Sequence, residues 1–263
     1  MAKKNRSTLK RYFREGALPS EDHFDDLIDS TLNTIDEGFD KNPENGFEIS
    51  LIGDHQRLIS FFQTGAAKDA VWTIDYQSEQ DRLLIKRPSA GEDVAPAMTF
   101  NGDGQVGVNN IKPAYTLDVG GVVAARGRIG ANPDKRKTIL ADGEWHDISG
   151  PLRGCHAIEV MAGVGSKGTG RYALMQAVAI NTFNPRGWLF NFLNLKKRIK
   201  YQQSYYLARG NRIKLRWREE GEQYYLQMRT SCDYGVGVKI RFYLTRLWFD
   251  EDMSESWQQE EDG

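Results

Sequence analysis

Several features that would point to metal chemistry or a membrane are scarce in this chain. Only two cysteines, Cys155 and Cys232, occur among 263 residues, too few to hold a metal ion by themselves. No apolar run reaches the roughly 18 residues of a membrane-spanning helix, so no membrane insertion is expected. The basic start MAKKNRSTLKRYF has no apolar signal core. We therefore expect no Sec export, and two reduced thiols.

The net charge is also close to zero, at −1. The molecule as a whole therefore has no positive electrostatic potential that would attract nucleic acid, and we expect no nucleic-acid partner. The charges are nevertheless segregated along the chain. Residues 1–14 carry six bases and no acid, residues 186–218 carry ten bases and no acid, and residues 250–263 carry seven acids and no base. Solvated faces are the common explanation of such runs, but the separation also suits contacts between subunits.

Catalytic and cofactor motifs are missing or incomplete. Gly163, Gly165 and Gly168 match the dinucleotide-binding spacing, but no acid follows until Glu219, so we predict a turn between strands instead. The four histidines lie in separate segments. His146 and His156 could meet in the fold as a catalytic or metal pair, or serve as structural histidines. We expect no enzyme activity, no cofactor and no metal site.

Two short helices are predicted at the start of the chain. Ser7 is predicted to cap the first, which Gly16 ends, and Ser20 is predicted to cap the second, which Gly38 ends. The second helix has an apolar stripe at three- and four-residue spacing. Its members are Phe24, Leu27, Ile28, Leu32 and Ile35. A pair of helices this small cannot bury its own stripe, so we expect the stripe to be an attachment interface.

From Gly46 the period changes to that of short strands bounded by turn residues. The segment NGDG at 101–104 predicts a hairpin turn. The segment 114–130 predicts a Leu-Asp-Val strand, a Gly-Gly turn and a second strand of small residues. These strands are too short and glycine-rich for a private core, so we expect the region to wind with copies of itself.

Between residues 138 and 249 the predicted strands are longer, with one apolar and one polar face each. Ile213, Leu215 and Trp217 alternate with basic residues, and so do Val236, Val238, Ile240, Phe242 and Leu244 with polar ones. This pattern is typical of antiparallel sheets covered on one side. The chain is thus predicted to be mainly β, with short N-terminal helices, a small shaft-like β region and a C-terminal antiparallel β-sandwich.

The basic and aromatic stretch 186–218 has three interpretations. Its aromatic residues fill the sandwich core while the bases face water, or the bases contact another subunit, or they bind a glycan or another anion. The candidate residues for a receptor or anion contact are Arg212, Lys214, Arg216 and Arg218.

Three segments carry a family resemblance. MTFNGDGQVGVNNIKPAYTLDVGGVVAARGRIG resembles the shaft repeat of phage tail-fibre and tail-spike proteins, although Asn109–Asn110 replaces the usual Gly-Thr and one copy is present. LKRYFREGALPSEDHFDDLIDSTLN resembles the start of fibre-like proteins of extracellular contractile injection systems. The block from WHDISG to LTRLWFD resembles the C-terminal domain of those proteins.

This resemblance implies a homotrimeric particle component, fibre-like or baseplate-associated. It would assemble in the bacterial cytoplasm and leave with the released particle. Other particle proteins of the baseplate or sheath, and a cell-surface glycan, are the implied partners. The implied organisation is an attachment segment (1–45), a shaft-like region (46–137), a head (138–250) and an acidic tail (251–263). The alternative is a stand-alone carbohydrate-binding β-sandwich protein or a glycan hydrolase.

Overall fold

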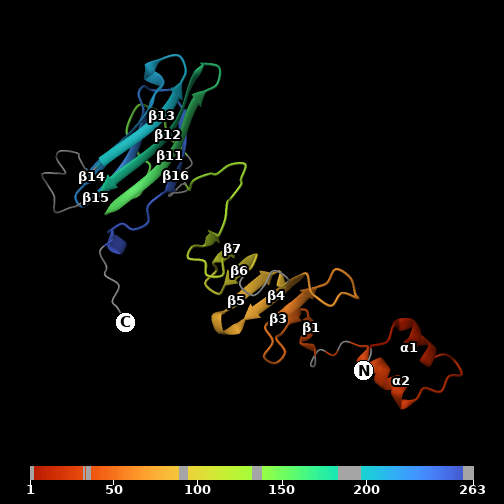
Figure 1. Ribbon diagram of the computed structural model, residues 1–263. Coiled ribbons are helices and arrows are strands. Elements are labelled where there is room, and N and C mark those ends of the chain that lie inside the picture. Colours follow the sequence, from red (N-terminus) through yellow and green to blue (C-terminus); the bar gives the residue numbers. More distant parts are fainter. Residues whose placement is uncertain are drawn as a thin grey trace. The chain divides into compact units, whose positions relative to one another are not determined.

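The computed structural model describes residues 3–31, 33, 37–88, 94–131, 138–182 and 197–256. It is mainly β, as predicted, with two short N-terminal helices and several antiparallel sheets. The chain divides into two compact units, residues 1–124 (unit 1) and 125–263 (unit 2), and each is considered by itself (Figure 1). None of the helices in the described ranges has the length and apolar composition that a bilayer crossing demands.

Two helices lie wholly within the described part of unit 1, α1 (Arg6–Tyr12) and α2 (Glu21–Asp29). The predicted cap Ser7 is wrong, because Asn5 caps α1 by accepting a hydrogen bond from the Thr8 backbone N–H at 2.9 Å. Ser20 caps α2 as predicted. Both helices end earlier than predicted, at Tyr12 rather than near Gly16 and at Asp29 rather than near Gly38.

The early end of α2 has a local cause. The Ser30 hydroxyl donates to the Asp26 carbonyl at 2.6 Å, and the Thr31 hydroxyl donates to the Ile28 carbonyl at 2.8 Å. The backbone N–H groups of Ser30 and Thr31 turn to the Leu27 and Ile28 carbonyls, three residues back, at 3.2 and 3.1 Å, and the two hydroxyls add bonds to carbonyls of the last turn. Of the predicted apolar stripe, Leu32 and Ile35 lie outside the described residues.

The strands of unit 1 form two sheets. A hairpin pairs β1 (Phe39–Asn42) with β2 (Gly46–Ile49). A six-stranded sheet has the order β3-β4-β5-β6-β7-β8 and is antiparallel except for the parallel pair β7–β8. Its strands are β3 (Arg57–Phe61), β4 (Trp72–Gln77), β5 (Arg82–Lys86), β6 (Met98–Asn101), β7 (Val106–Val108) and β8 (Leu117–Val119), with the 3-10 turn η1 (Ser78–Gln80) after β4.

Two predictions for this region have different outcomes. The hairpin at 101–104 is confirmed, since β6 and β7 pair across it and Gly104 adopts φ +79°. The strand pair predicted for 114–130 is wrong, because Leu117–Val119 is the strand there and residues 120–130 form no second strand. Val122 and Val123 are 98% and 69% exposed, so no packing holds them in a sheet.

Unit 2 is a β-sandwich of a five-stranded and a three-stranded antiparallel sheet. The five-stranded sheet has the order β13-β12-β11-β16-β9, and the three-stranded sheet has the order β10-β15-β14. Their strands are β9 (Thr138–Leu140), β10 (His146–Asp147), β11 (Cys155–Ser166), β12 (Arg171–Thr182), β13 (Lys197–Tyr205), β14 (Ile213–Glu220), β15 (Gln223–Thr230) and β16 (Lys239–Arg246). The 3-10 turns η3 (Arg209–Asn211) and η4 (Ser254–Ser256) complete the unit.

One core of buried side chains fills the space between these sheets. Val160, Met175 and Phe242 come from the five-stranded sheet, and Ile213 and Leu226 come from the three-stranded sheet. The predicted inward faces of β14 and β16 are confirmed, with one exception. Val236 is fully exposed, because the positive φ angles of Gly235 (104°) and Gly237 (78°) make a turn before β16 begins.

The other sequence features of unit 2 are also resolved. The turn predicted for the three glycines is confirmed at Gly168 and wrong at Gly163 and Gly165, which lie within β11. β12 is a strand where a dinucleotide site requires a helix. Cys155 and Cys232 are free thiols. The aromatic residues of 186–218 do not all fill the core, because Trp217 is buried whereas Tyr201 and Tyr206 are 54% and 63% exposed. Trp188, Phe190 and Phe192 lie outside the described residues.

Candidate functional site

The outer face of the three-stranded sheet gathers most of the predicted basic contact residues. Lys214, Arg216 and Arg218 project from β14 on the face opposite to Ile213 and Trp217. Arg212, which precedes β14, instead donates a hydrogen bond to the Tyr205 hydroxyl at 2.8 Å and stacks on its ring. The structure thus places three of the four predicted residues side by side on one surface.

Cross-strand pairing adds residues of β15 and β10 to this face. In the register of β14 and β15, Lys214 lies opposite Arg229, Arg216 opposite Gln227, and Arg218 opposite Tyr225. Asp147 of β10 lies opposite Gln227. The aromatic ring of Trp145 lies beside them, beneath two guanidinium groups. We call this surface the arginine face: Trp145, Asp147, Lys214, Arg216, Arg218, Glu220, Tyr225, Gln227 and Arg229.

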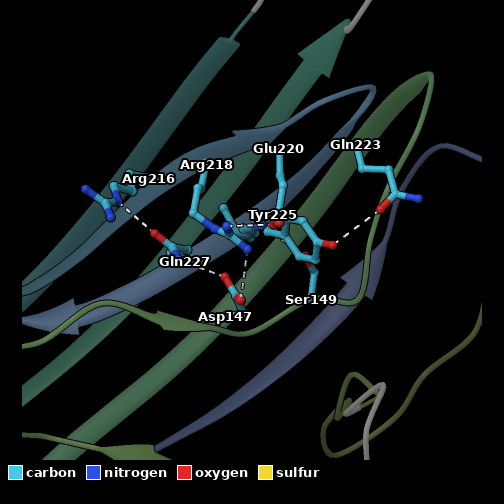
Figure 2. A network of polar contacts seen from close by, with 9 residues as sticks. Asp147, Ser149, Arg216, Arg218, Glu220, Gln223, Tyr225 and Gln227 are labelled. Carbon is cyan, nitrogen blue, oxygen red and sulfur yellow. Dashed lines mark hydrogen bonds and ion pairs between the residues drawn. The ribbon is translucent and has the colours of Figure 1, made fainter.

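Hydrogen bonds connect the middle of the arginine face, as Figure 2 shows. Arg216 Nε donates to Gln227 Oε1 at 2.8 Å, and Gln227 Nε2 donates to Asp147 Oδ1 at 2.8 Å. The amide of Gln227 is therefore satisfied at both ends although its side chain is buried. These two hydrogen bonds, from Asp147 through Gln227 to Arg216, hold the Arg216 side chain in one rotamer.

Each arginine of the face also lies over an aromatic ring. The guanidinium carbons of Arg216 and Arg229 lie 4.3 and 4.7 Å from the centroid of Trp145, and that of Arg218 lies 4.5 Å from the centroid of Tyr225. Such contacts attract a cation to the negative face of the ring and hold the guanidinium flat against it. These contacts place all three guanidinium groups against rings of the sheet surface.

Two acids neutralise one end of the arginine face. Arg218 bonds Glu220 at 2.8 Å and Asp147 at 3.3 Å (Figure 2). Partial burial would lower the pKa of Arg218, but its hydrogen bond with Glu220 and the charge of Asp147 together raise it above its ordinary value. Arg218 therefore remains a paired cation.

The sequence interpretation missed six residues of the arginine face: Trp145, Asp147, Glu220, Tyr225, Gln227 and Arg229. A signal existed for four of them. Glu220 continues the alternation of Arg216 and Arg218 along β14, and Tyr225, Gln227 and Arg229 alternate along β15 with the buried Tyr224, Leu226 and Met228. Trp145 precedes the two-residue strand β10, and Asp147 lies within it. A strand this short shows no alternation of buried and exposed residues from which its faces could be predicted.

The two histidines considered as a pair have separate partners. His146 Nε2 lies 2.8 Å from Asp142 Oδ1. His156 is buried, with Nδ1 2.7 Å from the Tyr224 hydroxyl and Nε2 3.4 Å from Glu251 Oε1. Burial lowers the pKa of His156 and raises the pKa of both Tyr224 and Cys155. The neighbouring Cys155 thiol is therefore less acidic than usual, opposite to the requirement for a nucleophilic cysteine.

The predicted attachment stripe is described in part. On α2, Phe24 is 50% and Ile28 is 66% exposed, and Leu27 is half-buried. Phe24 meets Phe13 edge to face at 5.5 Å between centroids, and Tyr12 stacks on His23 at 3.9 Å. The two helices thus order each other through their rings while an apolar edge of α2 stays in solvent.

Comparison of the chain with family models finds no match, and comparison with curated proteins finds none either. Within the described residues, no group of three or more His, Cys, Asp or Glu side chains is placed to hold a metal ion.

Proposed function

We propose that this protein is a homotrimeric structural component of a phage-tail-like contractile injection particle, fibre-like or baseplate-associated. In this proposal the N-terminal helices attach to the particle, and unit 2 is a head that contacts a receptor or a neighbouring subunit. It has no catalytic residue and no cofactor, and it leaves the cell with the particle. The observation that carries the proposal is the composition of one face of the six-stranded sheet in unit 1.

That face is apolar from one edge of the sheet to the other. The strand register places Ile74 beside Ile59 and Ile85, Phe100 beside Leu83 and Val106, and Val108 beside Met98 and Val119. We call it the apolar sheet face, and its residues are Ile59, Phe61, Trp72, Ile74, Tyr76, Leu83, Ile85, Met98, Phe100, Val106, Val108, Leu117 and Val119. The opposite face is largely polar, with Thr73, Asp75 and Thr99 at its centre.

The apolar sheet face keeps contact with solvent in the single chain. None of its residues is buried, and Phe61, Trp72 and Leu117 are 50%, 38% and 63% exposed. In the described part of unit 1, Ala70 and Leu84 are the buried hydrophobic side chains, whereas unit 2 has a full core. Fully burying one large apolar side chain is worth roughly 1.5–3 kcal/mol, so covering this face would stabilise unit 1 strongly.

Further copies of the same chain suit this face as its cover. Around a closed symmetry axis the same face of every copy can turn toward the axis, so apolar side chains of one copy would meet apolar side chains of the others. Three copies agree with the resemblance to trimeric shafts. Unit 2 has a second surface of this kind on the outer side of its five-stranded sheet, where Leu174 and Ile180 are 59% and 43% exposed.

Mass in solution tests the proposal. We expect light scattering coupled to size exclusion to give three times the chain mass at micromolar concentration. Ile74→Lys and Ile85→Lys together should yield monomers with a folded unit 2, because two charges would enter the covered face. Gln77→Lys, which adds a charge on the opposite face, should leave the trimer intact. A stable wild-type monomer would overturn the proposal.

The alternative of a stand-alone carbohydrate-binding protein has one observation in its favour, the ordered arginine face of unit 2. The two proposals differ in what purified particles contain. Immunoblots of particles sedimented from producing cells should show this chain if it is a particle component, and should lack it if it acts alone.

A further inference from the structure

One half of the arginine face carries positive charge that the described residues do not neutralise. Lys214, Arg216 and Arg229 have no acidic partner within ion-pair distance there, whereas Arg218 has two. Lys214 and Arg229 lie directly opposite each other across β14 and β15, and like charges in that position are destabilising. Two of these side chains, Arg216 and Arg229, lie over the ring of Trp145, and Lys214 is the cross-strand neighbour of Arg229. We call this group the Trp145 cluster: Trp145, Lys214, Arg216 and Arg229.

The geometry of the cluster prepares the guanidinium groups for a ligand. Arg216 Nε donates a hydrogen bond to Gln227, and Arg229 Nη1 donates one to the Gly143 carbonyl at 3.3 Å. Both guanidinium groups also lie over the ring of Trp145. The remaining N–H groups of Arg216 have no partner among the described residues. An arginine fixed on a ring loses little further freedom when its fork binds a carboxylate, sulfate or phosphate group through paired hydrogen bonds.

We propose that the Trp145 cluster is a binding site for the anionic groups of an acidic polysaccharide. Arg216 and Arg229 bind the anion, Lys214 adds charge, and Trp145 orients the guanidinium groups. The ring of Trp145 is occupied by these cations, so it acts as their support rather than as a stacking platform for a neutral sugar. The proposal refines the contact role of the head and in that respect rests on the proposed function.

The position of the cluster favours a polysaccharide over an acidic peptide. Peptides commonly bind by adding a strand to a sheet edge or by laying a helix in an apolar groove. The Trp145 cluster instead projects from the flat face of a sheet, and its β15 member Arg229 belongs to the central strand. A flexible polyanion can bind such a flat face, because it requires only that positively charged side chains on the face meet anionic groups along the polymer.

The experiment measures binding of the full-length protein to dextran sulfate and polygalacturonate, with neutral dextran and polyglutamate as comparisons. We expect binding to at least one acidic polysaccharide, none to dextran, and weakening with added salt. Arg216→Gln with Arg229→Gln should lower the affinity about tenfold or more, because both charged forks that would bind the anion are removed. Trp145→Leu should also weaken binding, although it removes no charge.

Two controls make the result specific. Arg218→Gln removes one charge from the same face but from its neutralised end, and we expect affinity within about twofold of wild type. Lysine at positions 216 and 229 keeps the charge and removes the fork, so affinity should lie between wild type and the glutamine variant. Circular dichroism establishes whether each variant is folded. If the glutamine variant does not fold, the affinity of the lysine variant still tests whether the guanidinium forks bind the anion.

Each alternative outcome overturns the inference. Equal losses for Arg218→Gln and for the cluster variant would indicate attraction to net charge alone. Preference for polyglutamate would indicate an acidic protein partner, and no binding to any polyanion at low salt would remove the site. Binding by a monomeric wild-type protein would leave this inference standing while the trimeric particle role failed, so the two proposals are tested separately.

Discussion

Adjacent residues of β14 and β16 differ sharply in environment, which determines what each can contribute. Trp217 is 8% exposed and packs edge to face against Tyr224, while its neighbours Arg216 and Arg218 lie on the arginine face. In β16, Phe242 is 2% exposed between Arg241 and Tyr243 on the other side. Substitutions at neighbouring positions should therefore affect either stability or surface contacts.

Phe242→Ala should destabilise unit 2 by about 3–5 kcal/mol, because it removes a fully buried ring and leaves a cavity. Urea unfolding followed by the circular dichroism of the sandwich measures the change. Arg216→Gln is the matched control and should cost about 1 kcal/mol, the ordinary value of one hydrogen bond. A tolerated Phe242→Ala with an unfolded Arg216→Gln would mean that the strand faces are inverted.

A second prediction at this scale concerns pH and His156. Burial lowers the pKa of His156 below its ordinary value of 6.5, despite the nearby Glu251, and the positive Arg246 lowers it further. The unfolded state therefore binds more protons below about pH 6.5, and stability falls as the pH falls through that region.

The measurement is the unfolding free energy of the wild type and of His156→Gln between pH 7.5 and 5.5. The variant should be less stable at pH 7.5, and its stability should fall less steeply with decreasing pH. Because carboxylates titrate in both proteins, the difference between the two slopes is the relevant quantity. Parallel slopes would show that His156 does not titrate on unfolding.

The alternation of apolar and polar residues predicted the inward residues of β14 and β16 well. Successive side chains of a strand point to opposite faces, so a strand buried on one side has an apolar residue at every second position. It could not find Trp145, whose place on the arginine face depends on the pairing of β10 with β15 across about 80 positions of sequence. It also placed Val236 in the core, because a run of alternating residues does not show that Gly235 and Gly237 turn the chain away.

At the scale of elements, the start of β11 is tied to the chain that follows β16. The Cys155 N–H donates to the Glu251 carbonyl at 2.6 Å, and the Leu247 N–H donates to the Ala157 carbonyl at 2.8 Å. Arg246 bonds the Glu251 side chain at 2.6 Å. Gly154 makes this approach possible, because a β-carbon there would lie 2.5 Å from the Glu251 carbonyl oxygen and its φ is +72°.

Gly154→Ala should therefore cost more stability than Gly168→Ala. Both glycines have positive φ angles, +72° and +80°, and a left-handed conformation alone costs an alanine about 1–2 kcal/mol. Gly168 has open space around its β-carbon position, whereas Gly154 meets backbone. Thermal unfolding of the two variants gives the comparison, and equal losses would show that the chain after β16 moves away freely.

Element ends were less predictable from sequence than element types. The apolar period of 20–38 continues past the last turn of α2, but the hydroxyls of Ser30 and Thr31 bond its carbonyls. In 114–130 the small residues allow a strand, yet the structure supplies a partner strand, β7, to Leu117–Val119 alone. Local pattern gives the tendency to form a strand, and pairing decides whether one forms.

At the scale of the whole molecule, buried apolar area is distributed very unevenly. The described residues of unit 2 enclose a continuous core, while unit 1 leaves the apolar sheet face only partly covered and an edge of α2 in solvent. Exposed apolar patches of this kind usually mark contacts with other molecules. If the apolar sheet face packs on copies of the same chain, as proposed above, the edge of α2 remains available for the proposed attachment to another particle protein.

Attachment through α2 predicts a separable defect. Ile28→Lys places a cation on a side chain that is 66% exposed, close to the C-terminal end of the helix, where positive charge is favourable. The helix should therefore persist, the trimer mass should be unchanged, and incorporation into particles sedimented from producing cells should be lost. Asp25→Lys, an exposed change on the same helix, is the control and should incorporate normally. If Ile28→Lys particles contain the protein at wild-type levels, α2 does not attach through this edge.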